Sequence, residues 1–524
     1  MSHSFSQVPR AEIPRSSFNR SHGLKTTFDA GWLVPIFVDE ALPGDTHSVR
    51  MTGFARMATP IHPVMDNLRM ETFFFGIPIR ILWDNWVKFN GEQVNPGDST
   101  DFLVPTMAAP ASVGHLNGSL SDYLGIPTEI PDFTHSSLWH RGYQLTWNEW
   151  FRDENLQNSV TVDKDDGPDT STDYALRRRG KRHDYFTSAL PWPQKGDSVN
   201  VPLGTSAPVS GLGFESQTYP GSSGTVYETS GSASTTYAKF INVDAGGASN
   251  RVLLEEDPNN TGFPAIFADL SAATGATINQ LRQSFQIQKL YERDARGGTR
   301  YTEIVRAHFG VISPDARLQR PEYLGGGSSP VNINPVAQTS STDATTPQGN
   351  LSAFGTAVLD GHGFTKSFTE HCVIIGLVNV RADLTYQQGL NRMFSRSTRW
   401  DFYWPALAHI GEQSVLNKEI YLQNAAADDL VFGYQERFAE YRYKPSMITG
   451  QFRSNYAQSL DTWHFAQDFS ALPVLNSSFI EDEPPIDRVI AVPTEPHFLF
   501  DAYFQVRSAR PMPMYGVPGL IDHF

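Results

Sequence analysis

Small or apolar residues alternate with polar ones in two segments near opposite ends of the chain. One face of residues 48–57 carries Val49, Met51, Gly53, Ala55 and Met57. One face of residues 498–507 carries Phe498, Phe500, Ala502, Phe504 and Val506. A period of two over this length predicts half-buried β-strands. In the first segment Phe54 is an exception, because it falls among the polar positions.

Residues 364–384 begin with an amphipathic pattern and become apolar on both faces around Cys372. This change is typical of a central strand that is covered on both sides. Residues 69–75 predict a further strand. Because the predicted strands are spread from about residue 50 to residue 500, one β-sandwich with long insertions explains them better than a string of separate domains. The predicted fold class is therefore all-β with helical insertions.

One helix is predicted over residues 277–297. Thr277 and Gln280 have the spacing of a capping box, and glycines at 297 and 298 supply the expected end. The apolar residues form two stripes: Ile278, Leu281 and Phe285, and Ile287, Leu290 and Tyr291. Two stripes indicate burial on two sides or a helix at an interface. Shorter helices are expected at residues 79–89 and 147–158.

Composition divides the chain into an arm, one large domain and one insertion. Residues 1–28 are polar, with spaced basic residues, and predict an extended N-terminal arm. We expect residues 29–524 to form a single domain. Within it, residues 196–275 are rich in Gly, Ser and Thr and poor in Lys and Arg, which predicts an ordered, β-rich surface excursion. Residues 325–350 are expected to form a second loop-like region.

The chain is acidic, with a formal net charge of −15 over 524 residues. Proteins that wrap nucleic acid by themselves are normally basic. If this chain encloses a genome, metal ions, polyamines or a separate basic protein must neutralise most of the phosphate charge. The aromatic share of 12% supports a large core or wide interfaces.

Neither export nor membrane insertion is predicted. The longest apolar run lies at Cys372 and is far shorter than the roughly 20 residues that cross a bilayer. The first twenty residues contain no apolar signal segment. Cys372 is the single cysteine, so the fold does not depend on an intrachain disulfide. These features predict a soluble protein that folds in a cytoplasm.

Nucleotide-binding and hydrolase motifs are absent from the sequence, and its histidines show no ligand spacing. We therefore expect no enzyme activity, no catalytic residue and no cofactor. The acidic stretch 163–169 resembles part of a calcium loop, but it lacks the required spacing and the Glu at the twelfth position. A solvated turn is the better interpretation, and a weak Ca²⁺ site stays open as the alternative.

One segment concentrates basic side chains: Arg177, Arg178, Arg179, Lys181 and Arg182. A solvated face or intersubunit salt bridges explain this cluster most simply. Contact with the phosphates of a packaged strand is the alternative. The neighbouring aromatic residues Tyr185, Phe186 and Trp192 could stack on bases, although core or interface packing suits each of them better.

Aromatic residues are candidates for subunit interfaces, where aromatics and Arg are enriched. The candidates are Trp400, Phe402, Tyr403, Trp404, Tyr434, Phe438 and Tyr515. The first four form one cluster, and Tyr434 and Phe438 belong to a second with Tyr441 and Tyr443; ordinary core packing is the alternative for both clusters. Tyr515 belongs to a C-terminal segment in which three prolines exclude a helix. We expect this segment to lie extended over its own subunit or a neighbour.

Several long segments together match one known family. They include RSSFNRSHGLKTTFDAGWLVPIFVDEALPGDT from Arg15, RRRGKRHDYFTSALPWPQKGD from Arg177, VIIGLVNVRADLTYQQGLNRMFSRSTRWDFYWP from Val373 and ARPMPMYGVPGLIDHF from Ala509. These segments closely resemble the major capsid protein of microviruses, with the gokushovirus branch as the best match. The resemblance runs from about residue 10 to the C-terminus and is weakest across residues 196–275.

The resemblance implies a single eight-stranded antiparallel jelly roll, a β-sandwich or barrel with long inter-strand loops. It implies a structural subunit of a T=1 icosahedral capsid, built through pentamers around circular single-stranded DNA and contributing to host attachment. In gokushoviruses an insertion such as 196–275 forms a protrusion at the threefold axes, so we expect this one to project outward.

The resemblance also implies partners and locations. The partners are further copies of the chain, the packaged DNA, a small basic DNA-binding protein, scaffolding and pilot proteins of the virus, and a receptor on the host cell. The locations are the virion and, during assembly, the bacterial cytoplasm.

Two other functions suit a β-sandwich: a carbohydrate hydrolase and a lectin-like carbohydrate-binding protein. The hydrolase requires a cleft with two poised carboxylates. Closed particles or pentamers of the purified protein would distinguish a shell subunit from both.

Overall fold

A computed structural model describes residues 13–196, 278–340, 342 and 347–516, together with short strands between residues 209 and 268. The chain divides into two compact units. The first comprises Met1–Pro193 and Ala295–Phe524, and the second comprises Gln194–Asp294. Each unit is described by itself.

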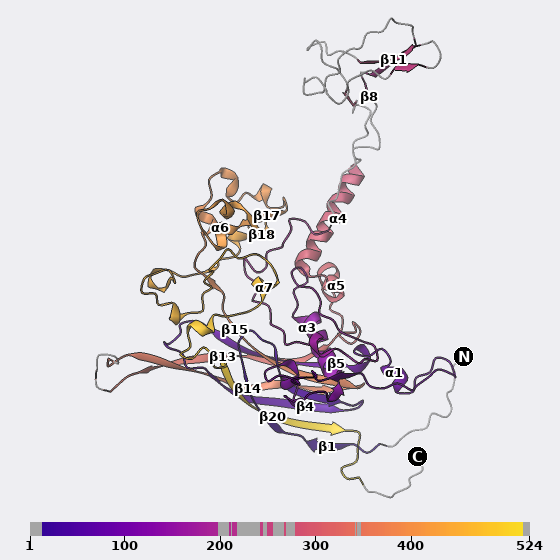
Figure 1. The fold of residues 1–524 in the computed structure, drawn as a ribbon, viewed down its shortest axis with the longest axis vertical. Helices are drawn as coiled ribbons and strands as arrows, with labels where there is room; N and C mark the ends of the chain where they lie inside the picture. The colour runs from indigo at the N-terminus through magenta and orange to yellow at the C-terminus, as the bar shows by residue number, and fades with distance from the viewer. Residues whose placement is uncertain are drawn as a thin grey trace. The chain divides into compact units, whose positions relative to one another are not determined.

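The first unit is built on one curled antiparallel sheet of nine strands (Figure 1). Pairing follows the order β1-β20-β4-β14-β13-β5-β15-β3, and β2 also pairs with β20. The strand bounds are β1 Ser16–Asn19, β2 His22–Phe28, β3 Val34–Ala41, β4 Thr46–Met57, β5 Leu68–Pro78, β13 Glu322–Ala337, β14 Leu351–Ser367, β15 Cys372–Ala382 and β20 Phe498–Arg510.

The pairing order divides this sheet into two four-stranded halves. One half is β2-β20-β4-β14 and the other is β3-β15-β5-β13. Along the chain, nearly every strand lies in the opposite half from the strand before it. The first part of β13 pairs with β5 and its last part pairs with β14, so this one strand joins the halves. This topology confirms the predicted jelly roll.

The sheet has nine strands where eight were predicted, because the N-terminal part of the chain contributes two short strands. There β1 and β2 pair in turn with the same strand, β20, and together they occupy one position of the predicted eight-stranded arrangement. Residues 16–28 of the predicted arm are therefore part of the sheet.

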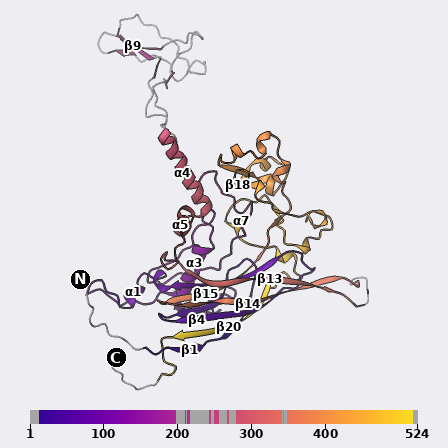
Figure 2. The ribbon, with the colours of Figure 1, turned by 180° about the vertical axis from the view of Figure 1, so that it is seen from behind.

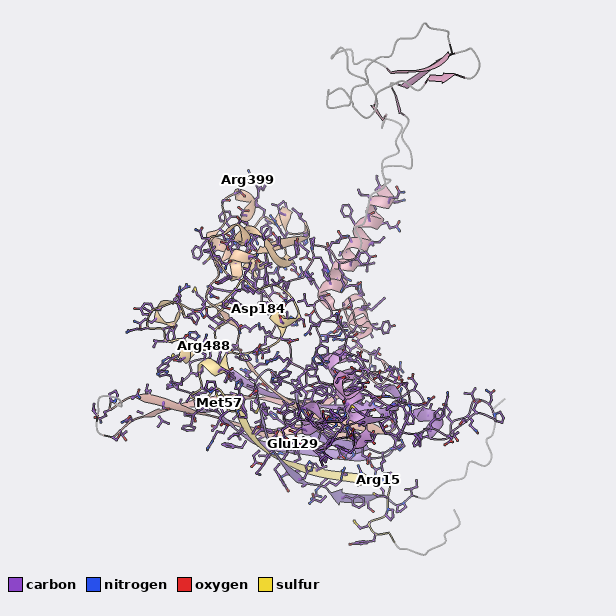
Figure 3. All side chains as sticks on the ribbon, in the orientation of Figure 1. Arg15, Met57, Glu129, Asp184, Arg399 and Arg488 are labelled. Atoms are coloured by element: carbon purple, nitrogen blue, oxygen red, sulfur yellow. The ribbon has the colours of Figure 1, made fainter. Side chains whose placement is uncertain are left out.

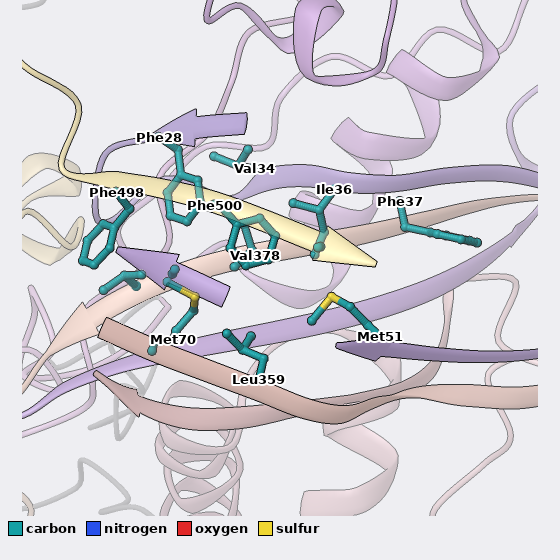
Figure 4. Close-up of a cluster of buried hydrophobic side chains, with 14 of the residues drawn as sticks. Phe28, Val34, Ile36, Phe37, Met51, Met70, Leu359, Val378, Phe498 and Phe500 are labelled. Atoms are coloured by element: carbon teal, nitrogen blue, oxygen red, sulfur yellow. The ribbon is translucent and has the colours of Figure 1, made fainter. Parts of the chain in front are cut away.

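The main hydrophobic core lies between the two halves (Figure 4). The alternation predicted for residues 48–57 and 498–507 is confirmed, because every inward apolar residue of β4 and β20 is buried. The exception, Phe54, points outward and is 44% exposed. One face of each strand therefore builds the core, and the other face meets solvent.

The two-sided burial predicted around Cys372 is also confirmed. Ile374 and Val378 of β15 belong to the core between the halves. Ile375 and Leu377 belong to a second core on the outer side of the β3-β15-β5-β13 half. Helix α3, Leu138–Trp150, covers that side. The thiol of Cys372 is free and buried.

The prediction of a loop over residues 325–350 is wrong in its first half, since β13 extends to Ala337. The glycines that suggested a loop are needed for close packing. A Cβ at Gly326 would lie 2.0 Å from the carbonyl oxygen of Thr72. A Cβ at Gly327 would lie 2.5 Å from the ring of His362. Glycine here permits close approach within the sheet.

The helix predicted over residues 277–297 is confirmed as α4, Ile278–Gly297. The prediction for 147–158 is wrong, because α3 begins earlier and ends at Trp150. Beyond it, the Asp153 carboxylate accepts hydrogen bonds from the backbone amides of Asn155 and Leu156, which favours a turn. In place of a helix over 79–89, the structure has a 3₁₀ turn followed by the one-turn α1.

The remaining elements are short. In the first unit they are α1 Trp86–Phe89, β6 Thr106–Ala108, α2 Leu120–Tyr123, β7 Thr134–Ser136, α5 Tyr301–Phe309, β16 Thr385–Tyr386, β17 Glu412–Leu416, α6 Asn417–Ile420, β18 Val431–Glu436, β19 Ser446–Met447 and α7 Ser477–Ile480. In the described residues, no helix has the length and apolar character needed to cross a membrane.

The second unit contains α4 up to Asp294 and five short strands. Its strands are β8 Val209–Ser210, β9 Leu212–Ser216, β10 Asn242–Asp244, β11 Ser249–Leu254 and β12 Phe267–Ala268. They pair antiparallel as β10-β11-β9 and β12-β8. Most of the predicted excursion lies outside the described residues, so its outward projection stays a prediction.

Candidate subunit-contact and nucleic-acid surfaces

The basic segment 177–182 lies against the edge of the β-sandwich. Arg178 bridges to Trp32, and Gly180 bridges to Glu481, through isolated backbone pairs. These pairs fix the segment's backbone, so its side chains project from a rigid support.

Arg179 is held inside an ion-pair network. Its guanidinium contacts the carboxylate of Glu71, which also binds Arg381 at 2.9 Å. The Arg179 side chain stacks 4.7 Å above the ring of Phe73. Burial, aided by the neighbouring Arg381, lowers the pKa of Arg179 to about 10. Burial alone would raise the pKa of Glu71, but the two arginines outweigh it and lower that pKa.

The other basic residues of the cluster also have partners within the chain. Arg178 pairs with Glu483 at 2.9 Å, and Arg182 pairs with Asp383 at 3.0 Å. The Lys181 ammonium donates a hydrogen bond to the carbonyl oxygen of Phe479 at 2.6 Å. The Arg177 guanidinium lies 5.8 Å from the centre of the Trp147 ring.

A buried carboxyl, Asp482, lies among these cations. Burial raises the pKa of Asp482 to about 7, even though four basic residues around it act in the opposite direction. The cluster is thus largely occupied in holding the subunit together. Its contact with DNA stays a prediction.

Two aromatic residues beside this cluster, Tyr185 and Phe186, are buried in a third core. They therefore pack within the subunit and are not exposed for stacking on bases.

A cavity of about 720 Å³ opens beside this cluster. Its wall includes the rings of Phe73 and Tyr323 and three carboxylates, Glu71, Asp153 and Glu303. Glu71 is paired with arginines, and Glu303 is paired with Arg300 at 3.0 Å. Asp153 accepts hydrogen bonds from the backbone amides of Asn155 and Leu156. All three carboxylates thus have partners within the chain, whereas a carbohydrate hydrolase requires an acid and a base that are free to exchange protons.

Most of the predicted interface aromatics are exposed in the single chain. Five are roughly half-exposed or more: Trp400, Phe402, Tyr403, Trp404 and Tyr515. Arg399, labelled in Figure 3, lies 4.1 Å from the centre of the Trp400 ring. Such a pre-positioned aromatic and arginine surface is typical of protein interfaces.

Two candidates follow the core-packing alternative instead. Phe438 is buried and lies 5.2 Å, ring to ring, from Tyr403. Tyr434 is only partly exposed on β18. Phe438 thus packs against the exposed cluster through Tyr403, whereas Tyr434 pairs through its backbone with Leu190. Nothing in the isolated sequence distinguished these two residues from the exposed ones.

The sequence analysis did not single out three exposed apolar residues at the two ends of α5 and just beyond it. Tyr301, Phe309 and Ile312 are each more than 70% exposed. Phe309 and Ile312 lie close together in the chain at the C-terminal end of α5, and neighbouring exposed apolar groups of this size mark a surface that meets a partner. The available signal was the helical spacing of Tyr301 and Phe309.

The acidic stretch 163–169 is folded around a buried arginine. Arg141 contacts the carboxylate of Asp169, and both side chains are fully buried. Asp166 accepts a hydrogen bond from the indole of Trp83 at 2.6 Å. In the part of the chain that the structure describes, no group of three or more His, Cys, Asp or Glu side chains is arranged so that it could hold a metal ion. A weak Ca²⁺ site here stays untested.

Three histidines lie together at the start of α3, where His140 of the helix meets His115 and His135. The Nε2 atoms of His115 and His135 are 2.9 Å apart, and the His135 and His140 rings are 5.3 Å apart. Burial, with a smaller effect of the other two histidines, lowers the pKa of His140 to about 3, while Asp169 acts in the opposite direction. The His140 Nε2 atom is 2.9 Å from the hydroxyl of Ser121.

Comparison with known proteins agrees with this architecture along the whole chain. The model of the phage capsid protein (F protein) family matches residues 6–520. This chain belongs to that family. The capsid protein VP1 of Bdellovibrio phage phiMH2K is 50% identical over 538 residues, covering 100% of this chain and 98% of that protein.

Two further relatives share this match. The capsid protein VP1 of Chlamydia phage 1 is 45% identical over 584 residues, covering 99% of this chain and 98% of that protein. The capsid protein VP1 of Spiroplasma virus 4 is 39% identical over 542 residues, covering 99% and 97%. The family assigns a structural role: capsid proteins assemble with copies of themselves into the shell of a virion.

The ion-pair network predicts a large effect at Glu71. Replacing Glu71 with Gln leaves Arg179 and Arg381 without their shared carboxylate. We expect the free energy of unfolding, measured by urea titration of the unassembled chain, to fall by about 3 kcal/mol. The matched control is Glu483→Gln, whose carboxylate is largely exposed, so its loss should cost less than about 1 kcal/mol. Equal effects of the two variants would contradict a structural role of the network.

The histidine cluster predicts a loss of stability in acid. Because His140 has a folded pKa of about 3 and an ordinary value of 6.5, the unfolded chain takes up a proton first as the pH falls. The stabilisation is therefore present above pH 6.5 and lost progressively below it. From pH 7 to pH 5, His140 alone should remove about 2 kcal/mol of unfolding free energy.

Urea titrations at the two pH values test this prediction. His140→Gln should show a loss smaller than that of the native chain by this amount. His409→Gln, at an exposed position, should behave like the native chain. An unchanged pH dependence in His140→Gln would refute the assignment.

Proposed function

We propose that this chain is the subunit of a T=1 icosahedral capsid that encloses circular single-stranded DNA and contributes to host attachment. One observation carries the proposal: a chain of a capsid family folds as a jelly roll and leaves large aromatic side chains exposed outside its core. A closed shell of identical subunits needs such self-complementary surfaces.

Two surfaces support assembly through pentamers. One is the exposed cluster of Trp400, Phe402, Tyr403 and Trp404, and the other is the exposed pair Phe309 and Ile312 at the C-terminal end of α5. Burying aromatic residues at a contact excludes water from a large apolar area, which is the main stabilising contribution in protein association.

The acidic charge of the chain supports a further partner for the enclosed DNA. Since the subunit carries a net charge of −15, a small basic DNA-binding protein would neutralise phosphates that the shell leaves uncovered. Scaffolding and pilot proteins of the virus complete the proposed partners. Assembly would take place in the bacterial cytoplasm before the virion is released.

The insertion 196–275 is the proposed host-attachment element. Its composition, rich in small polar residues and poor in Lys and Arg, suits an exposed structure that is not part of the common core. We place it at the threefold axes, where three copies would meet and present a surface to the receptor.

Assembly is tested by sedimentation and electron microscopy of the chain expressed with its viral partners. The native chain should form closed particles that contain nuclease-resistant DNA. The double variant Trp400→Ala with Trp404→Ala should reduce the yield of particles at least tenfold while the unfolding midpoint of the subunit stays nearly unchanged. Tyr456→Ala, a similarly exposed aromatic, is the control. Monomers from the native chain would reject the proposal.

Attachment is tested by replacing residues 196–275 with a short Gly-Ser linker. Particles should still form, because the sandwich strands lie outside this segment, but adsorption to host cells should fall to background. The fraction of particles that co-sediments with cells measures the effect. Normal adsorption of the shortened particles would remove this part of the proposal.

A further inference from the structure

The two outer faces of the β-sandwich differ in whether other elements cover them. The outer face of the β3-β15-β5-β13 half packs against α3 and its neighbours in a buried core. No described element covers the outer face of the β2-β20-β4-β14 half (Figures 1 and 2). We call this second surface the open face. An antiparallel sheet that faces water normally shows polar residues.

The open face instead displays aromatic and apolar side chains on all its long strands. They are Phe54 on β4, Leu499 and Tyr503 on β20, and Phe354 and Val358 on β14, each between 44% and 61% exposed. The strand register makes this a continuous surface. Phe54 on β4 lies between two cross-strand partners, Val358 on β14 and Asp501 on β20. Tyr503 is the next residue of β20 on the same face after Asp501. Phe54 and Tyr503 are thus diagonal neighbours, about 7–8 Å apart.

The charge on the open face is opposite to that of the whole chain. Its strands present the cationic residues Lys25, Arg50, Arg56 and Arg507 and two carboxylates, Asp360 and Asp501. The carboxylates are paired, Asp360 with Arg50 at 3.0 Å and Asp501 with Lys25 at 3.1 Å. Among the described residues, Arg56 and Arg507 have neither an ion pair nor a hydrogen bond from their side chains. Two exposed guanidinium groups therefore remain available beside the aromatic rings.

We propose that the open face binds single-stranded nucleic acid, with bases stacked on Phe54 and Tyr503 and phosphates held by Arg56 and Arg507. Aromatic rings on a sheet accept the faces of unpaired bases, and flanking cations bind the backbone. A base-paired strand would not expose those faces. This inference rests on the proposed enclosure of single-stranded DNA and assigns its main contact to the sheet.

The charge pattern favours nucleic acid over a second copy of the chain. A contact between two open faces would bring Arg56 and Arg507 against like charges, with no free carboxylate on either side. The basic segment 177–182 differs, because three of its arginines already have ion-pair partners. The open face combines unpaired cations with exposed rings.

The test uses the purified full chain and a fluorescein-labelled oligothymidylate of twenty nucleotides. Binding is measured by fluorescence anisotropy over a range of salt concentrations. Phe54→Ala with Tyr503→Ala should weaken binding about 100-fold, since each stacked base contributes roughly tenfold. Arg56→Gln with Arg507→Gln should make the slope of log affinity against log salt shallower by about 1.4, because each phosphate contact on a single strand contributes about 0.7.

Controls separate stacking from folding. Tyr456→Ala with Arg317→Gln removes an exposed ring and an exposed cation elsewhere and should bind like the native chain. Tyr503→Trp should keep the affinity and add fluorescence quenching on binding. Urea unfolding should show that the face variants remain folded, since the replaced side chains point outward.

Three outcomes overturn the proposal: face variants that bind normally, a native chain that binds no oligonucleotide, or face variants that change only sedimentation, which would identify a protein interface. The proposed capsid function has a separate readout. If native particles carry DNA and the face variants package it equally well, the open-face assignment is wrong and the capsid proposal stands. If the native chain forms no particles, the capsid proposal fails.

Discussion

The fold depends on the pairing of strands from opposite ends of the chain. Strand β20 lies between β4 on one side and β1 and β2 on the other, so residues near 500 pair with residues near 20 and 50. The core between the two halves closes only when this pairing forms. Such long-range pairing slows folding, but it also leaves the connections between strands outside the core. Loop closure depends only weakly on loop length, so these connections can carry a whole second unit.

The parts of the fold that follow from local sequence pattern could be predicted. The strands β4, β15 and β20 are visible in the sequence because burial imposes a period of two or a two-sided apolar run. The glycines of β13 misled the prediction, since their purpose is the close approach of Thr72 and His362, residues that are distant in sequence. The start of α3 was missed because its apolar residues pack on β15, about 230 residues away.

The surfaces were harder to predict than the strands. The basic segment 177–182 looked free in the sequence because its partners, among them Glu71 and Asp383, lie about 110 and 200 residues away. Conversely, Arg56 and Arg507 could be placed on the outward faces of their strands, but nothing in the sequence set them apart from other outward polar residues, since they stand singly. Phe54, Leu499 and Tyr503 were the available signals of the open face, since each is a large apolar or aromatic residue at an outward position of an alternating strand. Exposure of the aromatic cluster near Trp400 also needed coordinates, because exposed and buried aromatics look alike in sequence.

The single cysteine has a consequence for any container built from this subunit. Burial raises the pKa of the Cys372 thiol to about 12, so at neutral pH almost none of it is the reactive thiolate. The thiol is also buried at the start of β15, which restricts the access of oxidants and other thiols to it. When such a shell passes from a reducing to an oxidising medium, oxidation of Cys372 should therefore neither cross-link its subunits nor weaken the contacts between them.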